Sequence, residues 1–179
     1  MALARLKNGI YSVNGCQPGP CSNLVLAVHP YYQFDPDSLA FMSSPKLFDE
    51  SVGSYIYLGR FESLAKKEDM TLVTFEEAAR MSFTAERYRR IGRQNNTYFI
   101  KTIQAGPQPA ENEGGHLVEV PWNDVFDFLR LFEPADSTPI SCVGGYYREI
   151  PFFSGCLNDA EYVLREAGLP VEVLKEITF

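Results

Sequence analysis

The strongest constraint on the fold is an alternation of short apolar runs with stretches of helical period. The apolar runs predict five strands, over residues 24–28, 71–75, 98–103, 139–143 and 171–174. Four stretches between them repeat apolar residues at helical spacing, over residues 52–65, 76–91, 122–132 and 157–167. Strands that alternate with helices form parallel sheets, because each connection crosses one face of the sheet. The sequence therefore predicts an α/β fold, a three-layer α/β/α Rossmann-like domain with a mostly parallel sheet of about five strands.

The first 22 residues precede this alternation and have a different character. Asn8-Gly9 lies between Leu6 and Ile10, a pattern typical of a tight hairpin turn. A stretch rich in glycine and proline follows, over residues 14–21. The whole chain of 179 residues is long enough for one domain with its own core. We therefore expect an N-terminal arm or hairpin over residues 1–22 and a single α/β domain over residues 23–179.

Charge and apolar content argue against several classes of partner. The chain has 16 Lys and Arg against 23 Asp and Glu, a formal net charge of −7, and no basic cluster that would bind nucleic acid or an anionic membrane. No apolar run approaches the roughly 20 residues of a membrane span, and the N-terminus lacks the apolar region of a signal peptide. Four cysteines are too sparse for a disulfide scaffold. The sequence thus predicts a cytoplasmic protein with reduced thiols that binds neither nucleic acid nor membrane.

Candidate catalytic residues follow the ends of the predicted strands, where parallel sheets bind their ligands. His29 follows the first strand, Lys101 lies near the end of the third, and Gly144-Gly145 ends the fourth. Cys156 comes next, at or near a helix start, where backbone N–H groups and the helix dipole favour a thiolate. In a catalytic interpretation Cys156 attacks a carbonyl, His29 (or Asp35) takes the thiol proton, and Lys101 stabilises the developing charge.

Each of these residues also has a purely structural interpretation. Cys156 is equally explained as a small buried residue that packs its helix onto the sheet. Asn158 and Glu161 form an alternative capping box, which would begin the helix after Cys156. His29 is equally explained as a hydrogen-bonded histidine at a strand end, and Lys101 as a residue of an edge strand or one that reaches a carboxylate.

Aromatic pairs also follow the strand ends. They are Tyr31-Tyr32, Tyr146-Tyr147 and Phe152-Phe153. Aromatic side chains that converge there would line a pocket for a flat or apolar ligand, or would form a subunit interface. We therefore expect a small-molecule site that includes Tyr31, Tyr32, Gly144, Gly145 and Tyr146, with a homo-oligomer as the alternative.

The metal and cofactor signals are weak. The glycine-rich motifs that hold dinucleotides or nucleotide phosphates are missing from the sequence. Cys16 and Cys21 are separated by four residues and lack a second nearby pair, and His29 and His116 do not have ligand spacing. We therefore expect no metal and no cofactor, and the role of Cys16 and Cys21 stays open.

The order of these parts resembles the isochorismatase-like cysteine hydrolases. The stretch from Cys156 to Gly168, followed by Val171, is similar to the cysteine–helix–glycine–strand segment of that family. Lys101 falls in the order of the family's lysine, and His29 stands where the family has an aspartate. The resemblance implies a cysteine-dependent hydrolase of a small amide or ester. The alternative is a non-catalytic acidic α/β module that binds a small ligand or another protein.

Overall fold

The computed structural model describes residues 3–31, 51–93, 96–103, 117–133, 138–145, 147 and 155–178. Its strands are β1 (Leu3–Lys7), β2 (Ile10–Val13), β3 (Asn23–Val28), β4 (Met70–Glu77), β5 (Thr97–Ile103), β6 (Leu117–Val118), β7 (Ile140–Gly144) and β8 (Val171–Thr178). Its helices are α3 (Ser51–Ala65), α4 (Met81–Arg90), α5 (Trp122–Arg130) and α6 (Cys156–Glu166). The α/β class predicted from the alternation is therefore present.

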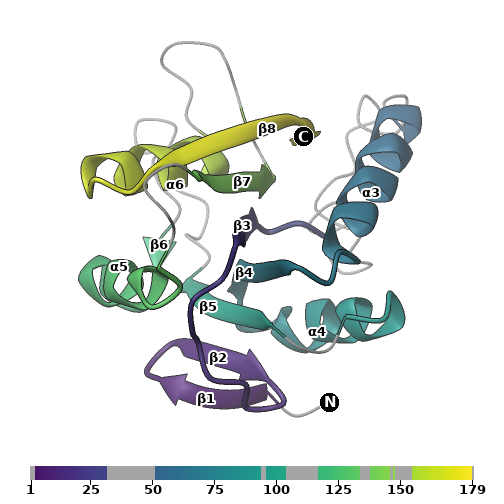
Figure 1. Cartoon of the computed structure of the whole chain (residues 1–179). Coiled ribbons are helices and arrows are strands. Elements are labelled where there is room, and N and C mark those ends of the chain that lie inside the picture. Colours follow the sequence, from purple (N-terminus) through teal and green to yellow (C-terminus); the bar gives the residue numbers. More distant parts are fainter. Residues whose placement is uncertain are drawn as a thin grey trace.

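The strands form one mixed sheet in the order β1-β2-β5-β4-β3-β7-β8, with β6 paired to β5 (Figure 1). The five predicted strands are β3, β4, β5, β7 and β8, and neighbours among them pair in parallel. The expected total of about five strands is wrong, because β1, β2 and β6 add antiparallel strands and give eight in the described part of the chain. Sequence order reverses between β3 and β7, and this makes a topological switch point.

Helices cover both faces of the sheet. In Figure 1, α3 and α4 lie on one side of the strands, and α5 and α6 lie on the other. Within β3, Leu24, Leu26 and Val28 pack in the core shared with α5 and α6, while Val25 and Ala27 pack in the core shared with α3 and α4. Both faces of β3 are therefore buried, which explains its unbroken apolar run. Among the described residues, no helix is both long and apolar enough to cross a bilayer.

Two element boundaries differ from the sequence prediction. A helix was expected from residue 76, but β4 continues through Glu76-Glu77 and α4 begins at Met81. Acidic residues favour the first turn of a helix, yet here they pair with the end of β5. The proposed helix start after Cys156 is also wrong. Cys156 is the first residue of α6, and Asn158 accepts a hydrogen bond from the Gly155 N–H at 3.0 Å.

The N-terminal hairpin is part of the sheet. Asn8 and Gly9 connect β1 to β2, and Gly9 has the positive φ (72°) that such tight turns require. Strand β2 then pairs antiparallel with β5, with Ile10 beside Ile100. The Lys101 N–H also donates to the Gly9 carbonyl at 2.7 Å. The hairpin thus covers a strand edge that β5 would otherwise expose.

Candidate functional site

At the switch point, the backbones of β3 and β7 are in direct contact. Gly144 has φ of 111°, and a Cβ atom there would lie 2.3 Å from the Val28 carbonyl oxygen. The next residue, Gly145, donates its N–H to the same oxygen at 2.8 Å. Strand β7 therefore approaches β3 more closely than any side chain permits. Both predicted glycines lie at the switch point, and their contact with a ligand stays a prediction.

A buried imidazole–carboxylate pair lies beside this contact. His29, directly after β3, is only 5% exposed and has φ of 43°. Its Nδ1 lies 3.4 Å from Oε1 of Glu76, a residue of β4 that is 1% exposed. Oε1 also accepts the Glu77 N–H at 3.0 Å, and Oε2 accepts the Thr84 hydroxyl at 2.7 Å. The carboxylate is therefore held in place from both strand and helix, as a buried carboxylate must be.

This geometry orients the histidine. When Glu76 accepts the proton on Nδ1, Nε2 becomes the basic nitrogen of the ring. The pair therefore fixes the orientation of the His29 ring at this edge of the sheet.

Cys156 lies with a different set of side chains, on the other face of the sheet. It packs against the core formed with α5 and α6. Glu77 and Thr102 are register neighbours two residues beyond Phe75 and Ile100, which belong to that same core, so strand alternation places them on this face. The Thr102 hydroxyl is buried and has no hydrogen-bond partner in the described part of the chain.

The surroundings of Cys156 disfavour a thiolate. Burial, followed by the carboxylates of Asp159 and Glu77, raises the pKa of the thiol to about 11. The N–H of Cys156 itself acts in the opposite direction, but the balance stays with the neutral thiol. The position at a helix start, from which the sequence predicted activation, is therefore correct, while its expected electrostatic effect is outweighed.

Lys101 is already paired with a carboxylate. Its ammonium lies 2.8 Å from the Glu119 carboxylate. Because Lys101 alternates with Ile100 along β5, it points to the α3/α4 face, away from the face that holds Cys156. The structure therefore does not bring Lys101 to Cys156. The edge-strand interpretation of Lys101 is also wrong, since β5 lies between β2 and β4.

The aromatic candidates from the sequence either pack in the core or fall outside the described residues. The Tyr31 ring is 1% exposed and meets Phe61 and Tyr88 edge-on, at centroid distances of 5.5 and 5.6 Å. Arg87 covers the Tyr31 ring at 5.3 Å. This packing makes Tyr31 a core residue beneath α3 and α4. Six further residues that the sequence singled out lie outside the described residues, namely Tyr32, Asp35, His116, Tyr146, Phe152 and Phe153.

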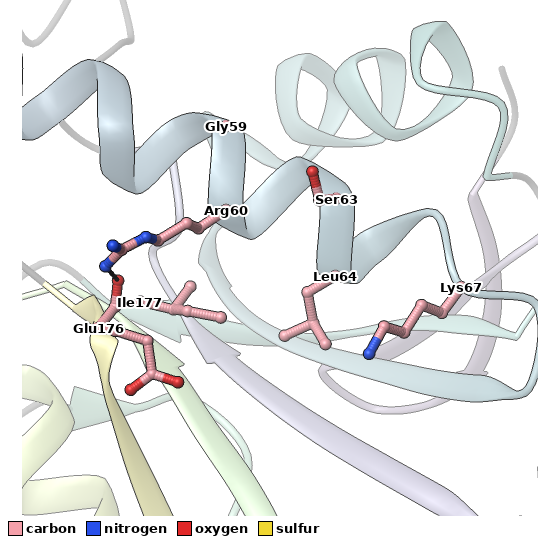
Figure 2. Close-up of a pocket in the computed structure, with 7 residues that line it drawn as sticks. All are labelled: Gly59, Arg60, Ser63, Leu64, Lys67, Glu176 and Ile177. Atoms are coloured by element: carbon pink, nitrogen blue, oxygen red, sulfur yellow. Dashed lines mark hydrogen bonds between the residues drawn. The ribbon is translucent and has the colours of Figure 1, made fainter.

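A wide groove lies apart from these clusters, between α3 and β8. Its volume is about 780 Å³, and Figure 2 shows Ile177 and Leu64 between the charged ends of Arg60 and Lys67. The Arg60 guanidinium donates to the Glu176 carbonyl at 3.1 Å. Exposed charges on an open groove do not converge on one point, so its size alone does not make it a functional site.

Four polar residues at the carboxyl edge were not among those predicted from the sequence: Glu76, Glu77, Thr84 and Thr102. The available signal was the strand 71–75, because its end falls at the same edge as His29. Assigning Glu76-Glu77 to a helix start concealed that signal.

Comparison with protein-family models, curated proteins and solved structures gives no match to this chain. Within the described residues, no group of three or more His, Cys, Asp or Glu side chains is placed to hold a metal ion. All four cysteines are free thiols. The fold and the polar clusters at the carboxyl edge are therefore what defines this protein: an α/β domain with a switch point flanked by a buried His–Glu pair.

Proposed function

We propose that the protein binds a small molecule at the carboxyl edge of β3, β4 and β7, with His29 as the polar anchor. In this proposal it is a diverged isochorismatase-like domain in which the imidazole takes the place of the family's aspartate. The four free thiols support a reducing, cytoplasmic environment. The bound compound carries a polar group that forms a hydrogen bond at this pair.

One observation carries the proposal: His29 adopts a left-handed conformation at the switch point while paired with a buried carboxylate. A non-glycine residue in that conformation costs about 1–3 kcal/mol and persists only where its surroundings determine it. Such residues cluster at ligand sites, and the carboxyl edge at a switch point is where open α/β sheets bind ligands. The two arguments are independent and point to the same residue.

The test uses the histidine signals themselves. The chain has two histidines, so its imidazole proton NMR spectrum has two sets of signals, and a His116→Gln variant assigns them. A fragment collection rich in hydroxyl and amide groups is screened against the full chain. We expect hits that shift the His29 signals and that lose about tenfold or more in affinity in His29→Gln. Hits that bind His29→Gln as tightly as the wild type would refute the proposal. Glu166→Gln, an exposed change on α6, is the control.

A second candidate is the cysteine-dependent hydrolase of a small amide or ester. The observation in its favour is that Cys156 opens α6 with the Glu77 carboxylate near enough to influence its pKa. In that case Glu77, on the same face, is better placed than His29 to take the thiol proton. The test is a panel of activated esters and amides. Turnover that disappears in Cys156→Ala and falls in Glu77→Gln supports the hydrolase, and equal turnover in Cys156→Ala excludes it.

A further inference from the structure

The turn of the N-terminal hairpin carries a reactive dipeptide. Asn8 and Gly9 connect β1 to β2 at one end of the sheet (Figure 1), and the Asn8 side chain is exposed. In an Asn-Gly sequence the backbone nitrogen of the glycine can attack the side-chain amide of the asparagine, because no Cβ atom hinders its approach. Asparagine is accordingly among the thermolabile residues. The turn therefore contains the reacting groups for a spontaneous change in its own backbone.

A guanidinium lies at the atom where negative charge develops in this reaction. Arg5, an exposed residue of β1, donates a hydrogen bond from its guanidinium to Oδ1 of Asn8. Attack on the side-chain amide turns this carbonyl oxygen into an oxyanion. A cation that is already hydrogen-bonded to the oxygen stabilises the charge as it forms. The contact with Arg5 therefore favours attack on the Asn8 side chain.

The same chain contains a second Asn-Gly sequence, Asn14-Gly15, directly after β2. Asn14 is also exposed, but within the described residues no Lys or Arg side chain donates a hydrogen bond to it. Asn14 therefore provides a reference in the same molecule for the reaction of this dipeptide without an adjacent cation.

We propose that Asn8 is a spontaneous modification site, at which Arg5 assists conversion of the asparagine to aspartate and isoaspartate. The Gly9 nitrogen loses its proton to water and bonds to Cγ of Asn8, and the side-chain nitrogen takes up a proton and leaves as ammonia. Water then opens the cyclic succinimide. Opening at the side-chain carbonyl gives aspartate, and opening at the main-chain carbonyl gives isoaspartate, whose backbone is one carbon longer. The net reaction consumes one water and releases one ammonia, and it is independent of any ligand at the carboxyl edge.

The isoaspartate product weakens the attachment of the hairpin to the sheet. Gly9 fits closely against its surroundings, since a Cβ atom there would lie 3.0 Å from Cβ of Val120. Its carbonyl accepts the Lys101 N–H at 2.7 Å. An additional backbone carbon directly before Gly9 displaces that carbonyl and disturbs the pairing of β2 with β5. The Lys101 amide therefore reports on this change.

The first experiment follows deamidation of the full chain at mildly alkaline pH by peptide mapping and mass spectrometry. We expect Arg5→Gln to slow the reaction at Asn8 about threefold, the size of effect typical of an exposed charge. Arg5→Lys keeps the charge and should retain the faster rate, and the rate at Asn14 should be the same in all three proteins. In concentrated urea the contact is lost, so the rate at Asn8 should no longer depend on residue 5. No reaction at Asn8, or equal rates in wild type and Arg5→Gln, would overturn the proposal.

The second experiment measures hydrogen–deuterium exchange at the Lys101 amide. The isoaspartate form is separated from the aged protein by ion-exchange chromatography. Asn8→Asp is the matched control, because it carries the same new charge without the additional backbone carbon. We expect exchange at Lys101 to be about tenfold or more faster in the isoaspartate form than in Asn8→Asp. Equal exchange in the two proteins would overturn the predicted effect on the hairpin.

Discussion

At the scale of single residues, the absence of a side chain at Gly144 allows β7 to approach β3 closely at the switch point. Its φ of 111° and the close Val28 carbonyl both exclude a Cβ atom. We predict that Gly144→Ala lowers the free energy of unfolding by more than about 3 kcal/mol, measured by urea denaturation.

The matched control is Gly59→Ala. Gly59 is exposed within α3, and a Cβ there meets nothing within 4 Å. Alanine at that position should stabilise the protein by up to about 1 kcal/mol, because it has the higher helix propensity. Equal effects of the two variants would show that the contact between Gly144 and Val28 has been misplaced.

The buried thiols give a prediction for alkaline pH. Burial raises the pKa of Cys156 to about 11, from an unfolded value of 9.0. Above pH 9 the unfolded chain loses this proton while the folded protein retains it, so stability falls as pH rises from 9 to 11. The loss due to Cys156 is on the order of 2 kcal/mol. Buried tyrosines act in the same direction, so the comparison of wild type with Cys156→Ala isolates the thiol. Parallel pH profiles of urea unfolding for the two proteins would contradict the prediction.

At the scale of elements, the start of α6 positions Cys156. The Asn158 side chain accepts the Gly155 N–H across the first turn, which fixes where the chain enters the helix. We predict that Asn158→Ala costs about 1 kcal/mol of stability, measured by thermal denaturation. It should also speed iodoacetamide modification of Cys156, because a frayed first turn exposes the thiol. Glu166→Ala, at the other end of α6, should change neither quantity. A stable variant with unchanged labelling would mean that Asn158 does not hold this turn.

At the scale of the whole molecule, burial should determine the order of amide exchange. Strands β3 and β4 have a paired strand on each side and helices over both faces, whereas β1 and β8 end the sheet. We predict that amides of residues 24–28 and 72–75 exchange last, and those of β1 among the first. Hydrogen–deuterium exchange followed by NMR measures this order. Protection of β1 equal to that of β3 would mean that its outer edge is covered by another chain.

The parallel half of this fold could be predicted from sequence because strands buried on both faces require continuous apolar runs. The antiparallel additions could be predicted only in part. The Asn8-Gly9 turn indicated the hairpin, but nothing in the sequence indicated that β2 would pair with β5. Strand β1 has only exposed and partly buried residues and includes Arg5, so hydrophobicity alone does not reveal it. Strand β6 has only two residues, and its pairing with β5 is not local in the sequence.

The candidate site was predictable only in part, for a similar reason. The carboxyl-edge rule placed His29, Gly144 and Cys156 near one edge, but it did not assign them to faces. Successive side chains along a strand point to opposite faces of the sheet, so Glu76 and Glu77 lie on different faces, and so do Lys101 and Thr102. The face on which each of these side chains lies depends on where its strand ends and on the register of the strand. The apolar pattern defines neither. The pairing of Lys101 with Glu119 depends on the short strand β6, which the sequence did not reveal.

The N-terminal hairpin has a consequence for the order of synthesis. Its strand β2 ends at Val13, but the strand that receives it, β5, begins about 80 residues later. At a synthesis rate of roughly 5–20 residues per second, the hairpin leaves the ribosome roughly 4 to 16 seconds before its partner exists. Ile10 and Val13 are fully buried in the folded protein. During that interval they cannot form their native contacts with β5, because that strand has not yet been synthesised. The hairpin is thus synthesised well before the strand that it pairs with, and slow translation would prolong its exposure to neighbouring chains.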